Sequence, residues 1–189
     1  MYGSNRFLVF IGSSGKLAMM PLSTAMRTIH RRGVNISARS NIYEATAEGV
    51  IEVFGSFVAP PSRDGGCLVV AASEHQLSKT AANAIEKSLD SLGYGVGRCA
   101  FVSRNADGLA LGGGELTTII EGLDPLCLVV ADGDCASALE QGYHAALVRD
   151  KSNRLFGRPC IVFRNFEPLL ETAEGKQKAW ALLKQLPRL

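Results

Sequence analysis

Four short apolar runs, each opening on a cysteine, constrain the fold more than any other feature of this sequence. They begin at Cys67, Cys99, Cys127 and Cys160. None of the runs shows the polar–apolar alternation of a half-exposed strand, so they are typical of strands buried on both faces. A recurrence of about 30 residues matches a strand followed by a returning helix. The sequence therefore predicts an α/β protein, a three-layer sandwich with a four-stranded, mainly parallel sheet.

Segments with helical spacing of apolar residues lie between these runs and after the last one. Ser73 and Gln76 form a plausible capping box before the first of these segments. We expect helices at residues 77–92, 115–121 and 135–148, and a terminal helix from Gly175.

The first 62 residues follow a different pattern and are expected to be mainly helical. One apolar stripe follows Pro21, and a second spans residues 50–58 and stops before Pro60. The link to the first cysteine run is short, and the helical stripes need a partner to pack against. We therefore expect a single domain, with a helical part at 1–62 and strand–helix repeats at 66–189.

The basic residues are unevenly distributed along the chain. Residues 1–43 contain no acidic residue, although the whole chain has 20 basic and 18 acidic residues. The basic residues of this segment are Arg6, Lys16, Arg27, Arg31, Arg32 and Arg39. Three interpretations remain open: pairing with the acidic remainder of the chain, binding of nucleic acid or another anionic partner, and an organelle presequence. For nucleic acid, the expected contacts are Arg27, Arg31 and Arg32.

Several classes of protein are disfavoured by composition. No apolar run approaches the ~18 residues of a membrane helix, so no membrane contact is expected. Five cysteines, an odd number, without a Cys-x-x-Cys pair favour a reducing compartment and disfavour a zinc site. We expect a soluble cytoplasmic protein without a metal or cofactor. No sequence pattern indicates its oligomeric state.

The glycine-rich segment "FIGSSGKLAMMP" does not satisfy the requirements of a phosphate-binding loop. Only two residues separate Gly12 from Gly15, whereas a Walker loop has four between its glycine and the Gly-Lys pair. Leu17 also stands where that loop has a magnesium-binding hydroxyl. We interpret these glycines as turn residues.

Polar side chains follow each of the four predicted strands. Ligands of open parallel sheets bind beyond the carboxyl ends of the strands, near the switch in strand order. The candidate catalytic residues at these ends are Glu74, His75 and Asp132. The candidate ligand-binding residues are Arg104, Asn105, Asp134, Arg164 and Asn165.

These candidates have structural as well as chemical interpretations. Glu74 follows the first strand and is the acid we would choose to polarise a water molecule. His75 is adjacent to it, but a helix-capping role suits that position better. Asp132 and Asp134 have the oxygen ligands that magnesium prefers, yet capping of the following helix is the preferred interpretation.

The order of strands and helices, with "GLDPLCLVVADGDCASALEQGY" as the third strand, turn and helix, resembles the uracil-DNA glycosylase superfamily over residues 66–186. In that family the turn after the first strand carries the water-activating acid or amide, and a His-Pro-Ser type segment follows the fourth strand. Here those places read "AASEHQ" and "VFRNFE". The resemblance therefore implies the architecture, and no catalytic residue is carried over.

Three functions follow as hypotheses. The first is a non-catalytic protein of glycosylase-like architecture that binds a ligand, such as an anionic small molecule, or nucleic acid. The second is a hydrolase acting on a nucleotide or nucleobase through residues of the sheet-end loops, with Glu74 as the acid. The third is a structural or oligomer-forming protein.

Overall fold

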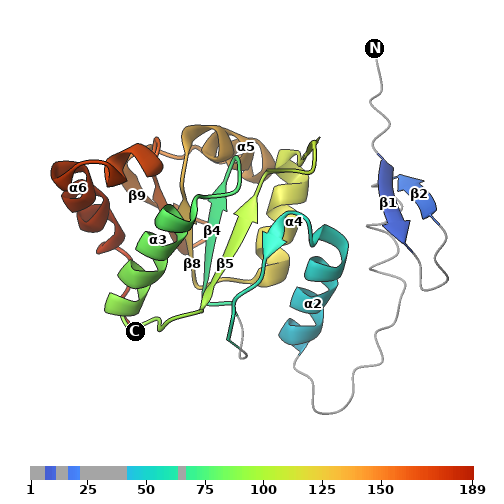
Figure 1. Ribbon diagram of the computed structural model, residues 1–189, viewed down its shortest axis with the longest axis horizontal. Helices are drawn as coiled ribbons and strands as arrows, with labels where there is room; N and C mark the ends of the chain where they lie inside the picture. Colours follow the sequence, from blue (N-terminus) through green and yellow to red (C-terminus); the bar gives the residue numbers. More distant parts are fainter. Residues whose placement is uncertain (1–6, 12–16, 22–41, 64–66) are drawn as a thin grey trace. The chain divides into compact units, whose positions relative to one another are not determined.

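The computed structural model describes residues 7–11, 17–21, 42–63 and 67–189, which belong to two units, 1–45 and 46–189 (Figure 1). In the first unit, β1 (Phe7–Ile11) pairs antiparallel with β2 (Leu17–Pro21). Both strands precede the first helix expected from the sequence, which was placed after Pro21. The aromatic and branched residues of "FLVFI" suit a strand. The helix expected after Pro21 lies outside the described residues.

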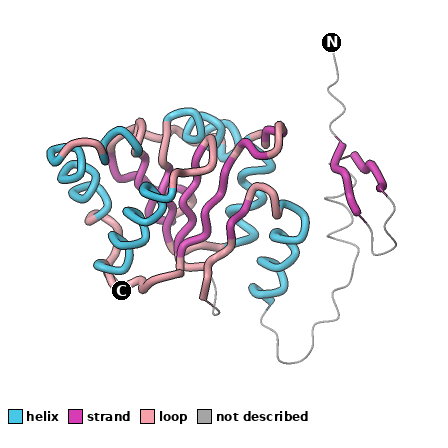
Figure 2. Tube along the Cα trace, viewed as in Figure 1, coloured by secondary structure: helices cyan, strands magenta, loops and turns pink. Residues whose placement is uncertain are grey.

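The second unit is built on a six-stranded mixed sheet (Figure 2). Its strands, in spatial order, are β3 (Val58–Ala59), β5 (Cys99–Ser103), β4 (Val69–Ser73), β8 (Cys127–Val130), β10 (Arg158–Val162) and β9 (Lys151–Leu155). The four inner strands are the four cysteine runs, and all of them are parallel, as predicted. The outer strands β3 and β9 run antiparallel to their neighbours, so the expected sheet of four strands is too small.

Both outer strands lack the sequence pattern of a buried strand. β9 reads "KSNRL" and is mostly exposed, and a tight turn at Phe156 and Gly157, with φ of 49° and 81°, joins it to β10. β3 has only two residues, within a stretch that we expected to continue a helix. That helix, α2 (Ile42–Phe54), ends earlier, and Val58 pairs with Val102 instead.

The helices of the second unit follow the predicted order with shifted ends. They are α3 (Lys79–Ser91), α4 (Gly113–Leu123), α5 (Gly133–Tyr143), a 3-10 turn η1 (Glu167–Leu170) and α6 (Ala173–Leu183). The expected capping box of Ser73 and Gln76 is wrong. Ser73 is the last residue of β4, and the cap of α3 is Ser78, whose hydroxyl accepts a hydrogen bond from the Ala81 amide at 3.2 Å.

One face of the sheet packs against α3 and α6. Val69, Ala71 and Val129 from the parallel strands form a single core cluster with Ile85 of α3 and Leu183 of α6. The cysteines of this unit form no disulfide, and all except Cys67 are buried. They act as small core residues. Burial also raises the pKa of thiols such as Cys99 and Cys135 and keeps them protonated.

Helices α4 and α5 approach each other closely through glycines. A Cβ added to Gly142 would overlap the Gly113 carbonyl oxygen and the Thr117 hydroxyl. Gly122 of α4 makes a similar close contact with the Val50 side chain of α2. At Gly142 only glycine permits the observed separation, because a Cβ there would meet the backbone of Gly113.

A small hairpin follows β5 before α4 begins. Its strands are β6 (Asn105–Ala106) and β7 (Leu109–Ala110), and its turn residues Asp107 and Gly108 have positive φ, as Asp-Gly hairpin turns require. Over the part of the chain that the structure describes, no helix is long and apolar enough to cross a membrane.

Candidate functional site

The switch in strand order lies between β4 and β8. The chain passes from β4 to β5 on one side of it and then crosses to β8 on the other side. Because the four inner strands are parallel, their carboxyl ends lie along one edge of the sheet. The loops after β4 and β8 meet at this switch, which is where open parallel sheets bind ligands.

The Asp132 carboxylate joins the loop after β4 to the start of α5 by two hydrogen bonds. Its Oδ2 accepts a hydrogen bond from the Glu74 amide at 2.7 Å, and its Oδ1 accepts one from the Cys135 amide at 2.8 Å. It is the cap of α5, as the preferred interpretation of the sequence states. Asp134 is exposed in the first turn of α5. Within the described ranges, no group of three or more histidine, cysteine or acidic residues is placed to hold a metal ion.

Glu74 is clamped by the two residues that follow β5. Its Oε1 accepts hydrogen bonds from Arg104 Nη1 at 2.6 Å and from Asn105 Nδ2 at 2.9 Å. The side chains of Arg104 and Glu74 are 29% and 16% exposed, so water screens this ion pair only in part. The hydrogen bond to Glu74 raises the pKa of Arg104 above its usual value. The guanidinium is held further by Nε, which donates to the Leu111 carbonyl at 2.9 Å.

Two buried oxygens of this cluster have no donor. Glu74 Oε2 and Asn105 Oδ1 lie out of contact with solvent, and no described residue donates a hydrogen bond to either. A buried acceptor left in this state costs about 1–3 kcal/mol. The Glu74–Arg104–Asn105 cluster is thus well fixed on one side and unsatisfied on the other.

His75 is exposed beside this cluster and is not oriented by Glu74. Its Nδ1 lies 3.4 Å from Asn105 Nδ2, and its backbone carbonyl accepts a hydrogen bond from the Ser73 hydroxyl at 2.5 Å. The Glu74 carboxylate is directed at Arg104 and Asn105 instead. The residues therefore do not form the paired base and orienting acid that a histidine general base needs.

A groove of about 460 Å³ lies beside the end of β5. Phe101, Val58 and Leu77 give it apolar walls, and Asn105 connects it with the Glu74 cluster. Its other polar lining residues include Ser103, Gln76, Lys79 and Asp107. A groove with apolar walls and a few polar groups has the composition of a small-molecule site.

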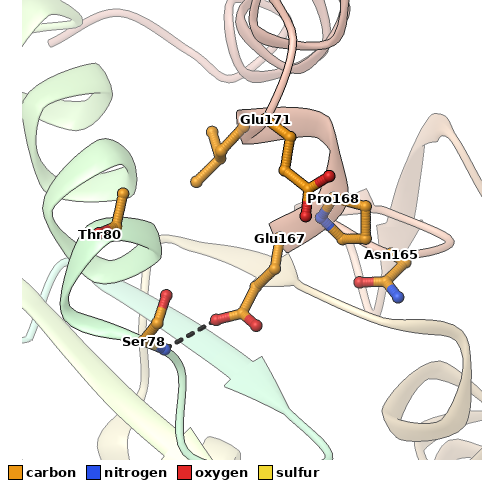
Figure 3. A pocket seen from close by; sticks show the side chains of 7 residues that line it. Ser78, Thr80, Asn165, Glu167, Pro168 and Glu171 are labelled. Atoms are coloured by element: carbon orange, nitrogen blue, oxygen red, sulfur yellow. Dashed lines mark hydrogen bonds between the residues drawn. The ribbon is translucent and has the colours of Figure 1, made fainter.

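The loop after β10 forms a separate polar region. The Arg164 amide donates to Asp150 Oδ1 at 2.9 Å, and its exposed guanidinium lies 3.4 Å from Asp150 Oδ2. Asn165 makes a backbone bridge with Asp132, so this loop borders the switch. Asn165 also lines a cavity of about 370 Å³ together with Glu167 and Glu171 (Figure 3).

The amino ends of the helices at this edge already hold carboxylates. In Figure 3, Glu167 reaches from η1 to the start of α3, where its Oε1 accepts a hydrogen bond from the Ser78 amide at 2.7 Å. Glu115 Oε2 accepts from the Gly112 amide at 2.6 Å at the start of α4, and Asp132 does the same for α5. A phosphate at any of these three ends would meet an existing negative charge.

The structure thus divides the predicted site residues into groups. Glu74, His75, Arg104, Asn105 and Asp132 lie together around the switch. Asp134, Arg164 and Asn165 have no side-chain hydrogen bond to that cluster among the described contacts. Arg27, Arg31 and Arg32 lie outside the described residues.

Sequence reasoning missed the groove residues Ser103, Gln76 and Lys79, and also Glu167. Ser103 is the last residue of a predicted strand, and Glu74 directly follows another. The rule that identified Glu74 from its position at a strand end could therefore have identified Ser103 as well. Glu167 had none, because it reaches α3 from 89 residues further along the chain.

The fold and this edge define an α/β protein with a partly parallel sheet and a polar cluster at its switch in strand order. The sequence matches no protein-family model, and a search of the curated proteins found no match.

Proposed function

We propose that the protein binds a small molecule in the groove beside β5 and does so without catalysis. The observation that carries this proposal is the position of Asn105. Asn105 lines the groove, and its side-chain nitrogen Nδ2 donates a hydrogen bond to Glu74 Oε1 at 2.9 Å. A binding site needs such an oriented polar group next to apolar walls.

The clamped state of Glu74 favours binding over chemistry. A carboxylate that accepts a proton from water must approach that water within hydrogen-bond reach. Glu74 Oε1 is already engaged by Arg104 and Asn105, and Oε2 is out of contact with solvent. The cluster serves better as a rigid wall of a site than as a base.

A fragment screen tests the proposal directly. Amide NMR spectra of the full chain are recorded with and without each compound, and binders are expected to shift the signals of Ser103 and Asn105. Ala82 lines the groove, so Ala82→Leu should fill it and weaken binding at least about tenfold. Ala146→Leu at an exposed position is the matched control. The proposal fails if no compound shifts these signals or if Ala82→Leu binds as well as the control.

The architecture of this proposal is the one that the sequence resemblance implies. We infer a three-layer sandwich of the uracil-DNA glycosylase type in a cytoplasmic protein. Support comes from the four parallel strands separated by helices, and from the packing of α3 and α6 on one face of the sheet.

A hydrolase is the second candidate, because Glu74 follows the first parallel strand directly at the switch. In a screen of nucleosides and uracil-containing DNA, Glu74→Gln should then abolish any turnover. Unchanged turnover in this variant would exclude Glu74 from the mechanism.

Nucleic-acid binding stays a proposal that rests on the acid-free sequence of residues 1–43. Contacts of Arg27, Arg31 and Arg32 with phosphates would be independent of base sequence and would weaken steeply with salt. Filter binding at low salt tests this, and absence of retention for single- and double-stranded oligonucleotides would refute it. A structural protein, the third hypothesis, should show no rise in melting temperature across a metabolite panel.

A further inference from the structure

We infer that a second groove, between α6 and the loop after β10, binds a molecule that carries a single carboxylate group on an apolar body, as a medium-chain fatty acid does. This second groove has a volume of about 490 Å³. It shares no lining residue with the groove beside β5, so the inference is independent of the proposed function. The residues that line it are Asp150, Arg164, Asn165, Leu169, Lys178, Ala181 and Leu182.

The second groove has an apolar wall built from α6 and η1. Ala181 and Leu182 follow Lys178 by three and four residues on α6, so all three lie on one face of that helix. Leu169 of η1 and Leu182 are partly buried and pack against the core cluster. Gly175 holds η1 against α6, because a Cβ at this position would overlap the Leu169 backbone. The wall is therefore fixed by the protein before a ligand binds.

Arg164 supplies a guanidinium group whose two outer nitrogens are free. Its Nε lies 3.4 Å from Asp150 Oδ2, while Nη1 and Nη2 donate to no residue in the part of the chain that the structure describes. The side chain is 80% exposed. Two neighbouring N–H groups of a guanidinium match the two oxygens of a carboxylate. Arg164 can therefore bind a ligand carboxylate without giving up a hydrogen bond inside the protein.

The charges along the second groove favour an anionic ligand. Of the described residues that line it, Arg164 and Lys178 are positive and Asp150 is negative. The Asp150 carboxylate is already engaged, since its Oδ1 accepts a hydrogen bond from the Arg164 amide at 2.9 Å. A cationic ligand would meet both positive side chains, and a neutral one would leave the outer nitrogens of Arg164 unused.

Lys178 can contribute to the binding of an anion at little cost. Its Nζ lies 2.7 Å from Glu174, but the two side chains are 65% and 76% exposed. Water screens an ion pair this exposed, so the pair holds Lys178 only weakly. The ammonium group can therefore turn toward a ligand carboxylate.

Three compounds test the two parts of the ligand separately: octanoate, octanamide and acetate. Octanamide keeps the apolar chain without the charge, and acetate keeps the charge without the chain. In amide NMR spectra of the full chain, we expect octanoate to shift the signals of Arg164, Leu169 and Leu182. It should bind at least about tenfold more tightly than either of the other two compounds. High salt should reduce its advantage over octanamide, because exposed charges are screened.

A matched pair of variants provides the second measurement. Arg164→Gln should weaken octanoate binding about tenfold and leave octanamide binding unchanged. The variant should fold, because the backbone amide that binds Asp150 is retained. Arg154→Gln is the control, since Arg154 is exposed on β9 and is not among the residues that line this groove. It should bind octanoate as the unmodified protein does.

Three results would overturn the inference. The first is equal binding of octanamide and octanoate, and the second is unchanged octanoate binding by Arg164→Gln. The third is a set of octanoate shifts confined to Ser103 and Asn105, which would exclude the second groove and leave the proposed function standing.

Discussion

Glu74 and Arg104 meet across the ends of two neighbouring parallel strands, with 2.6 Å between Oε1 and Nη1. The sequence marks both residues as candidates for chemistry, one as an acid and the other as a cation for a ligand. Because the two side chains pair with each other, Glu74 is not available as an acid and Arg104 is not available as a cation for a ligand. The pair instead fixes the end of β4 to the end of β5 and orients Asn105 beside the groove.

Loss of this ion pair should destabilise the protein. We expect Arg104→Ala to lower the free energy of unfolding by about 2 kcal/mol, because it leaves a mostly buried carboxylate without its charged donor. Urea denaturation measures this change. Adding Glu74→Gln should cost less in the Arg104→Ala background than alone, with a coupling of about 1 kcal/mol.

Lys178→Ala breaks the exposed pair with Glu174 and should change stability by less than about 0.5 kcal/mol. Equal effects of the two alanine variants would contradict this account.

The two aspartates after β8 should differ strongly in their effect on stability. Asp132→Ala removes acceptors from the Glu74 and Cys135 amides, so we expect a loss of about 2 kcal/mol. Asp134→Ala removes only an exposed charge from the first turn of α5, and a loss below about 0.5 kcal/mol is expected. Thermal and urea unfolding of both variants test this. A similar loss in both would favour a shared role, such as the magnesium site considered from the sequence.

The close approach of α4 and α5 predicts an asymmetric response to alanine. Gly142→Ala should lower stability by about 2 kcal/mol or more, because the new methyl group overlaps the Gly113 carbonyl and Thr117. Gly114→Ala is a suitable control, since no atom lies within 4 Å of its added Cβ. Alanine is the better helix former, so this control should be neutral or stabilising by up to about 1 kcal/mol. A neutral Gly142→Ala variant would show that the helices can separate at little cost.

Acid should weaken the ion pair between Glu140 and Arg149, in which Oε1 and Nη1 lie 2.6 Å apart. The hydrogen bond from Arg149 lowers the pKa of Glu140 below its usual 4.5. A lowered folded-state pKa stabilises the protein above pH 4.5, and this contribution disappears as the pH falls through the lowered value. Stability should therefore decrease on acidification from pH 7 to pH values well below 4.5. Glu140→Gln should be less stable at pH 7 and lose less on acidification, whereas Glu171→Gln, at an exposed site, should follow the unmodified protein.

The thiols should be unreactive while the protein is folded. Cys67, the least buried of the five, has its pKa raised to about 11 by burial, so it is protonated at pH 8. Titration with Ellman's reagent at pH 8 should give slow labelling of the native protein and rapid labelling of all five cysteines in guanidinium chloride. A native thiol that reacts as fast as the denatured ones would contradict the burial of these side chains.

The inner sheet could be predicted from the sequence because burial on both faces leaves uninterrupted apolar runs. β9 could not, since the lysine, serine and arginine of "KSNRL" have the composition of a loop and pair only because β10 lies beside them. β3 was assigned to a helix because Val58 continued the helical spacing of α2.

The site could be predicted in position but not in arrangement. The polar residues at strand ends were identified, since parallel strands end at one edge. Their partners depend on strand order, which the sequence did not reveal. Only the neighbouring positions of β4 and β5 bring Arg104 to Glu74, and only the β4–β8 neighbourhood brings Asp132 to the Glu74 amide. The groove was missed because β3 forms one of its walls.

The polar composition of β9 has a consequence for self-association. A chain that tried to add a strand beyond β9 would approach the exposed side chains of Lys151 and Arg154, and Asn153 already uses its amide group to bind the Val148 and Lys151 carbonyls. At the other edge of the sheet, β3 has only two residues with which a strand of another chain could pair. Both edge strands therefore disfavour the addition of further strands and the growth of amyloid-like ribbons. The interior strands of the sheet are as apolar as strands that form amyloid.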